Sequence, residues 1–190
     1  NQSITEAMLQ FIEESPTAFH AAANVEALLL ENGFEKLENL AEGALVPGGS
    51  YYTMQNGSAV LAVKIPENPA KGFRIAASHS DSPCFKIKEV PEMKVENTYV
   101  KLNVEKYGGM ILSPWLDRPL SVAGRVFVAG KDGKPEVKLV NLKKDLLIIP
   151  NVAIHFNREI NNGFAYNPQT DMAPLMGLDQ ELSSKKLCAD

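Results

Sequence analysis

Apolar residues in the first thirty positions recur at helical intervals and predict two helices. The first is amphipathic, and Ser3 and Glu6 have the spacing of a capping box at its start. Ser15-Pro16 interrupts this pattern, and a second helix is predicted from Thr17 to a stop at Asn32-Gly33. The apolar positions are Ile4, Met8, Phe11 and Ile12 in the first helix and Ala18, Ala21, Ala22, Val25, Leu28 and Leu29 in the second.

The pattern then changes from helical periodicity to short strands. Residues 51–54 and 59–65 flank Asn56-Gly57, a pair that favours a tight hairpin because both residues tolerate positive φ. The apolar run 73–77 predicts a short strand that is covered on both faces and leads directly to His79.

From Phe85 onward, apolar and polar residues alternate, which predicts half-exposed antiparallel sheet. A turn is predicted at Asp132-Gly133, and the run 146–149 is expected to continue the strands. The alternating apolar positions are Phe85, Ile87, Val100, Leu102, Val104, Val122, Val126, Val128, Val137 and Leu139. The chain is therefore predicted to be α+β, with an α/β part before residues 82–90 and a β-rich part after them.

Composition and charge narrow the classes of function. The 190 residues are 45% hydrophobic and 22% charged, as in a folded soluble protein. A net charge of -4 without clustered Lys and Arg argues against a nucleic-acid or acidic-membrane partner. No apolar run is long enough for a membrane span. The two cysteines, Cys84 and Cys188, show neither disulfide nor zinc-finger spacing, so a reducing, cytoplasmic setting is expected.

The stretch from Ala77 to Cys84 contains the pair of residues most suited to metal chemistry. It follows the predicted buried strand, and α/β enzymes place their sites at such strand ends. A neutral imidazole is a good zinc ligand, and a carboxylate that accepts its other N–H makes the ligating nitrogen more basic. His79 and Asp81 supply both groups within three residues. Taken alone, the pair is also consistent with an ordinary turn or helix cap.

Other polar residues have simpler interpretations. His155, between Ile154 and Phe156, is predicted to be a hydrogen-bonded sheet residue, and His20 a helix residue with a polar tip. A nucleophilic mechanism through Ser80, Ser82 or Cys84 is disfavoured, because no Gly-x-Ser-x-Gly elbow or papain-like signature is present. Cys84 is predicted to be a small buried residue.

Five separated stretches, in their order and spacing, resemble the M18 (aspartyl aminopeptidase) family of metallopeptidases. They span roughly residues 15–178. One departure is Met110, where family members commonly have a further glycine. The stretches are Ser15–His20, His79–Cys84, Tyr107–Gly109, Trp115–Ser121 and Ile149–His155.

The resemblance implies a particular architecture. Residues 1–88 would be the amino-terminal part of a zinc-peptidase domain, and residues 89–190 a β-rich inserted dimerisation domain, incomplete in this chain. Assemblies in the family are homo-oligomers, dimer-based and often dodecameric, that act on peptide substrates.

The resemblance also implies roles for three residues. His79 would be a zinc ligand, Asp81 would orient it, and His155 would enter a neighbouring subunit's site to bind substrate or stabilise an oxyanion. The complete enzyme would be an aminopeptidase with two zinc ions (Zn²⁺). Its remaining ligands and its base would lie downstream, since family members are more than twice this length, so the 190-residue chain is expected to be inactive alone. Asp171, Asp179, Glu181 and Asp190 match no family motif.

An alternative of another class remains open at this point. The β-rich half has alternating strands suited to an oligomer surface, and the chain would then be a non-catalytic oligomerisation module. The preferred amino-terminal residue of a substrate is not indicated by the sequence.

Overall fold

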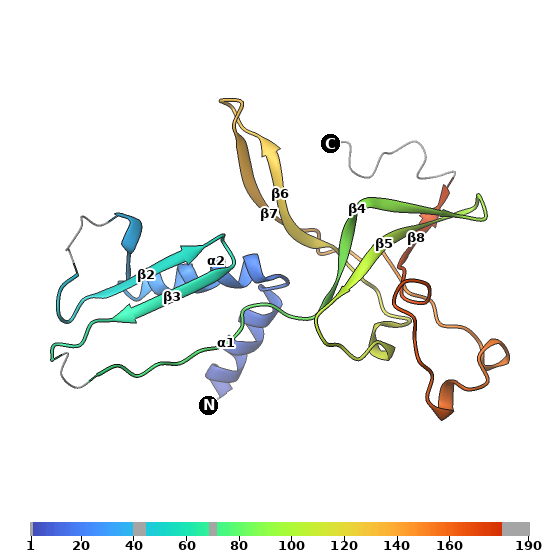
Figure 1. Cartoon of the computed structure of the whole chain (residues 1–190), viewed down its shortest axis with the longest axis horizontal. Helices are drawn as coiled ribbons and strands as arrows, with labels where there is room; N and C mark the ends of the chain where they lie inside the picture. The colour runs from blue at the N-terminus through green and yellow to red at the C-terminus, as the bar shows by residue number, and fades with distance from the viewer. Residues whose placement is uncertain (1, 40–44, 69–71, 180–190) are drawn as a thin grey trace. The chain divides into compact units, whose positions relative to one another are not determined.

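The structure is a computed structural model that describes residues 2–39, 45–68 and 72–179 (Figure 1). The chain divides into two compact units. The first contains Asn1–Ser82 and Ala123–Asn141, and the second contains Pro83–Val122 and Leu142–Asp190. The chain is mixed α and β, with both helices in the first unit and sheets in both. No helix in the described ranges has the length and apolar character that a membrane crossing requires.

Two helices open the first unit, α1 (Gln2–Glu13) and α2 (Ala18–Glu31). The predicted break at Ser15-Pro16 is confirmed, and the side chain of Thr17 caps α2 by accepting from the backbone N of His20. The predicted stop is also confirmed, because Asn32 is the C-cap and Gly33 has a φ of 75°. The capping role predicted for Ser3 is wrong, since α1 already includes Gln2 and Ser3 therefore lies inside the helix.

A three-stranded sheet with the order β1-β2-β3 follows these helices. Its strands are β1 (Glu35–Lys36), β2 (Ser50–Gln55) and β3 (Ala59–Lys64), with β1 parallel and β3 antiparallel to β2. The predicted hairpin turn is confirmed: Asn56 and Gly57 have φ values of 54° and 68°. Such a turn matches the twist of the strands that it joins.

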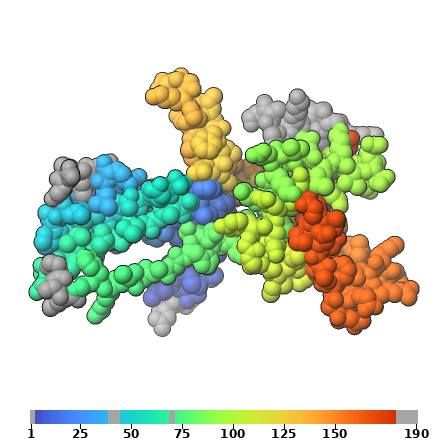
Figure 2. All heavy atoms as spheres, in the orientation of Figure 1, coloured from blue at the N-terminus to red at the C-terminus, as the bar shows by residue number. Residues whose placement is uncertain are grey.

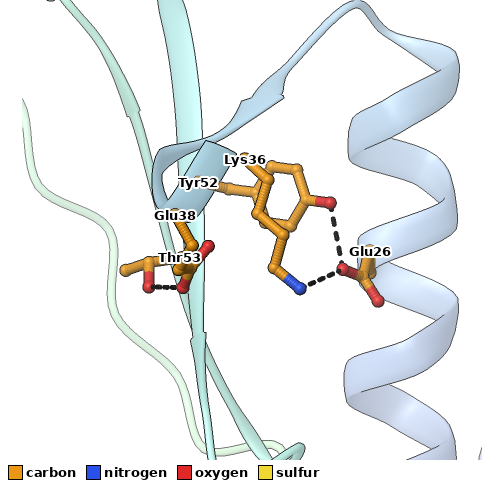
Figure 3. Close-up of polar contacts among 5 residues, drawn as sticks. All are labelled: Glu26, Lys36, Glu38, Tyr52 and Thr53. Carbon is orange, nitrogen blue, oxygen red and sulfur yellow. Dashed lines mark hydrogen bonds and ion pairs between the residues drawn. The ribbon is translucent and has the colours of Figure 1, made fainter. Parts of the chain in front are cut away.

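A polar cluster joins α2 to this sheet (Figure 3). Oε1 of Glu26 accepts from the Lys36 ammonium at 3.2 Å and from the Tyr52 hydroxyl at 2.9 Å. The hydrogen bond and charge of Glu26 raise the pKa of Lys36, while burial and then the bond to Glu26 raise the pKa of Tyr52. Tyr52 is only 1% exposed, so its hydroxyl needs a partner and α2 supplies it.

The segment between β3 and the second unit differs from the prediction. Residues 73–77 were predicted to be a strand covered on both faces, but none of residues 72–83 is in a strand. Ile75 is 90% exposed and Phe73 is 59% exposed. An interior strand needs neighbours that supply backbone partners on both edges. Within the described residues, no strand pairs with this segment, so it stays extended (Figure 2).

The second unit is built on the antiparallel sheet β4-β5-β8. Its strands are β4 (Cys84–Val95), β5 (Tyr99–Tyr107) and β8 (Leu175–Leu178). The predicted alternation is confirmed in β5, where Val100, Leu102 and Val104 are buried between more exposed neighbours. Leu147 packs with this core.

The run 146–149 does not continue the strands as predicted. It makes two isolated bridges instead, from Leu147 to Leu120 and from Ile148 to Leu175. Adjacent residues of a single extended segment thus pair with different partners, because the segment passes between them rather than running along one strand.

The antiparallel hairpin of β6 (Ala123–Ala129) and β7 (Pro135–Asn141) forms a two-stranded ribbon (Figure 1). The turn predicted at Asp132-Gly133 is confirmed, with a φ of 71° at Gly133. Arg125 lies opposite Leu139, and Phe127 lies opposite Val137. Directly opposite residues share a face, so these four side chains lie on one side of the ribbon.

Tyr52→Phe is expected to weaken the attachment of α2 to the sheet, because it removes the hydroxyl that donates to Glu26 while keeping the ring. We expect a melting temperature about 2–4 °C lower, followed by circular dichroism. Tyr99→Phe is the matched control, since Tyr99 is 44% exposed. Equal melting temperatures for the two variants would contradict a stabilising role for this bond.

Candidate functional site

His79 and Asp81 lie together in the extended segment that precedes β4. Nδ1 of His79 is 3.0 Å from Oδ1 of Asp81 and 2.8 Å from the backbone oxygen of Asp81. The His79 side chain is 81% exposed and that of Asp81 39% exposed. The structure thus brings together the two residues that the sequence singled out, on a short loop rather than after a paired strand.

The partners of Nδ1 fix the tautomer of the neutral imidazole. Both are oxygens that only accept hydrogen bonds, so Nδ1 carries the hydrogen and donates it. The lone pair then lies on Nε2, which is the state in which histidine binds a metal ion. An exposed ring with an oriented Nε2 is suited to be one ligand of a zinc site.

One ligand does not make a site. Structural and catalytic zinc sites in proteins take at least three protein ligands. Within the described ranges, no group of three or more His, Cys, Asp or Glu side chains is placed to hold a metal ion. His79 and Asp81 therefore suit one ligand of a zinc site and the carboxylate that orients it. The other ligands would have to come from residues outside the described ranges.

Ser80 fixes this segment to the hairpin turn of the first unit. Its hydroxyl donates to the backbone oxygen of Ser58 at 2.8 Å. The hydrogen goes to a carbonyl and not to the His79 ring, whose Nδ1 is already engaged by Asp81. Ser80 is consequently not arranged as an activated nucleophile, which would need a base in hydrogen-bond reach of its hydroxyl.

His155 lies in the second unit, in the single-turn 3-10 helix η4 (Ile154–Phe156), and it is exposed. The prediction that it is a sheet residue is wrong. The preceding Pro150 and the absence of a strand partner in the described chain leave residues 151–153 without ladder hydrogen bonds, so the chain closes into a short turn instead.

Two of the stretches singled out in the sequence are joined in the second unit. Asp117 has a φ of 56°, and its Oδ1 accepts from the backbone N of Asn151 at 2.9 Å. Its own backbone N donates to the oxygen of Ile149 at 2.9 Å. These two bonds tie the 115–121 stretch to the 149–155 stretch, at positions six and four residues before His155.

Glycine suits position 108 because the backbone there is left-handed, a conformation that residues with a side chain rarely adopt. Gly108 has a φ of 79°, and a Cβ there would lie 3.4 Å from the Cα of Pro83. Cys84, predicted to be buried, is only half-buried at the start of β4.

A depression in the second unit is a different feature from the His79 segment. It is lined by residues from 117–119, from 145–148 and from β8, and its surface is mainly apolar. Its only titratable lining groups are Asp117 and Asp145. Neither His79 nor His155 lines it, so it adds no ligand to a metal site around His79.

Comparison with known proteins decides the family. The model of the family described as aminopeptidase I zinc metalloprotease (M18) matches residues 11–188. The chain belongs to the M18 family. It is 46% identical over 182 residues to the probable M18 family aminopeptidase 2 of Clostridium acetobutylicum, covering 94% of this chain and 42% of that protein.

Solved structures agree with this assignment. A chain in the cryo-EM structure of the Ape4 and Nbr1 complex is 37% identical with a TM-score of 0.87, over 100% of this chain and 36% of that one. The S. cerevesiae mApe1 dodecamer is 25% identical with a TM-score of 0.74, over 91% of this chain and 38% of that one. This M18 chain thus spans about two fifths of the length of the curated relatives it matches.

Sequence reasoning missed two residues at the β2–β3 turn, to which Ser80 is bonded. Ser58 belongs to this turn and Arg125 donates to it, yet nothing in their spacing indicated this. Arg125 donates from a guanidinium nitrogen to the Asn56 oxygen at 2.8 Å and lies 4.1 Å from the centre of the Phe19 ring. The one available signal was an arginine among the apolar positions of β6, since such a cation needs partners.

His20, predicted to be a helix residue with a polar tip, is confirmed as such and is expected to make stability depend on pH. Its Nδ1 is 2.8 Å from the Thr17 hydroxyl, and burial lowers its pKa below 6.5. The unfolded chain therefore binds more protons than the folded chain below pH 6.5, so stability decreases as the pH falls through this range.

The measurement is the melting temperature between about pH 7 and pH 5, where an unperturbed histidine titrates. His20→Gln is expected to flatten the decrease over this window, and His155→Gln, at an exposed position, is the control. A curve of unchanged slope in His20→Gln would show that another group is responsible.

Proposed function

We propose that the whole protein containing this chain is a two-zinc aminopeptidase that removes amino-terminal residues from peptides. The observation that carries the proposal is the His79–Asp81 contact, in a chain that belongs to a family of zinc aminopeptidases. His79 would hold zinc through Nε2, and Asp81 would keep the ring in the required tautomer. When bound, zinc supplies Lewis acidity toward a peptide carbonyl and lowers the pKa of a water molecule.

The 190-residue chain by itself is proposed to be inactive. Its described residues offer one oriented imidazole and no three-ligand group, so they would bind zinc weakly. The relatives are more than twice as long, and the further ligands and the general base are proposed to come from the part of the protein outside this chain.

His155 is proposed to act on substrate in a neighbouring subunit of a homo-oligomer. Its exposed position on η4 suits a group that reaches another chain. The dodecameric assembly of the S. cerevesiae mApe1 relative supports an oligomer. In this arrangement the imidazole would donate a hydrogen bond to the developing oxyanion and would take no part in binding zinc.

Asp81→Asn tests the orienting role. An amide can occupy the same position but lacks the negative charge of the carboxylate, so zinc affinity in the natural full-length protein is expected to fall ~10–100-fold. Zinc affinity would be measured by competition with a chelator. Ser82→Ala is the control, because Ser82 is an exposed neighbour. Wild-type affinity in Asp81→Asn would refute the role of this carboxylate.

His155→Ala separates substrate chemistry from metal binding. In the full-length protein, kcat on an aminoacyl anilide is expected to fall roughly 10²-fold, as for loss of an oxyanion donor, while zinc content and melting temperature stay at wild-type values. If kcat is unchanged, the shared-site proposal is incorrect. Loss of zinc together with kcat would instead assign His155 to the metal.

A further inference from the structure

The segment that carries His79 is hydrogen-bonded to the β2–β3 turn of the first unit, and this turn is also bonded to β6. The segment 72–83 has no strand partner in the described chain, so its geometry depends on a few local contacts. Ser80, the residue after His79, connects this segment to the rest of the unit by donating its hydroxyl hydrogen to the backbone oxygen of Ser58.

Ser58 belongs to a turn whose shape is strongly determined. Asn56 and Gly57 both have positive φ, and the backbone N of Ser58 donates to the oxygen of Gln55 at 3.2 Å. Because β2 and β3 pair in register up to Gln55 and Ala59, the turn is held at both ends by sheet hydrogen bonds. A turn of well-determined shape is a suitable base on which to fix a segment that has no strand partner of its own.

The same turn is also held from β6. The Arg125 guanidinium donates to the Asn56 oxygen, and its Cζ lies 4.1 Å from the centre of the Phe19 ring and 5.5 Å from that of Phe127. Arginine combines such ring contacts with directed hydrogen bonds, and lysine does not reproduce this geometry. Arg125 therefore connects the start of α2, the β2–β3 turn and β6.

We propose that Ser80 and Arg125 are positioning residues for His79, acting through the two backbone oxygens of the Asn56–Ser58 turn. Arg125 fixes the turn, the turn accepts the Ser80 hydrogen bond, and Ser80 fixes the backbone that carries His79 and Asp81. This inference rests on the proposed zinc-binding function of His79. In it, the turn restricts the position of Nε2.

The first test compares Ser80→Ala with Ser80→Thr and Ser82→Ala in the natural full-length protein. Ser80→Ala is expected to weaken zinc binding, measured by chelator competition, by roughly fivefold, the equivalent of one ordinary hydrogen bond. Ser80→Thr keeps a hydroxyl and is expected to restore most of this loss. Ser82→Ala is expected to bind zinc like the wild type.

A second readout follows the imidazole without metal or activity. In the zinc-free protein labelled with ¹⁵N-histidine, the signal that disappears in His79→Ala reports which ring nitrogen carries the hydrogen. Ser80→Ala is expected to reduce the population of the Nδ1–H tautomer, because a less restricted backbone lets the ring leave Asp81. A defect that acts only on overall folding would not shift this tautomer selectively.

Arg125 is tested by a double-mutant cycle. Arg125→Ala is expected to weaken zinc binding about as much as Ser80→Ala, Arg125→Lys to recover little of it, and the double variant to be no worse than either single one, because both residues act through the same turn. If the losses of zinc affinity in the two single variants add up in the double variant, Ser80 and Arg125 do not act through the same turn and the proposal is overturned. If Arg125→Ala fails to fold, the Ser80 series alone decides.

The outcomes separate this inference from the function on which it rests. If His79→Ala loses zinc while Ser80→Ala binds it like the wild type, the positioning role is overturned and the zinc site stands. If His79→Ala itself retains wild-type zinc affinity, the proposed function fails, and the positioning role fails with it.

Discussion

The hydrogen bond from Nδ1 of His79 to Asp81 is the interaction on which the proposed zinc chemistry depends. Histidine is useful to a metal only when one ring nitrogen carries the hydrogen and the other presents a lone pair. Here two acceptor oxygens of a single residue face Nδ1, so the neutral ring has one tautomer and its free nitrogen is Nε2. This contact is local and is made within three residues.

Local order of this kind is not sufficient to define a metal centre. The His79 side chain is largely exposed, and the described residues contain no group of three potential ligands. Relatives extend well beyond the length of this chain. In the proposed function, the chain presents one oriented ligand to a site that other parts of the whole protein complete.

Side-chain contacts link the segment that carries His79 to the sheet of the first unit. Glu26 ties α2 to Lys36 and Tyr52, and the sheet carries the tight Asn56-Gly57 turn. Ser80 donates to that turn from the His79 segment, and Arg125 donates to it from β6. Under the proposed positioning role, these distant residues would influence the position of a single imidazole.

The sequence alone determined the features that depend on neighbouring residues. The helix limits at Thr17 and Asn32, the hairpin turns and the alternating core of β5 all follow from φ preferences and periodicity. The His79–Asp81 pair has the same origin, because two residues suffice to form it. The family, too, could be recognised from the order of short motifs, since that information is linear.

Only the tertiary structure decided which distant residues meet. The strand predicted at 73–77 to be buried is exposed and unpaired among the described residues. An apolar run indicates that a segment favours burial, but it does not identify the strands that would pair with it. Likewise, the run 146–149 divides its bridges between two neighbours, and Arg125 finds Asn56 across 69 residues of sequence. Such pairings are set by the path of the whole chain, and no short stretch of residues contains them.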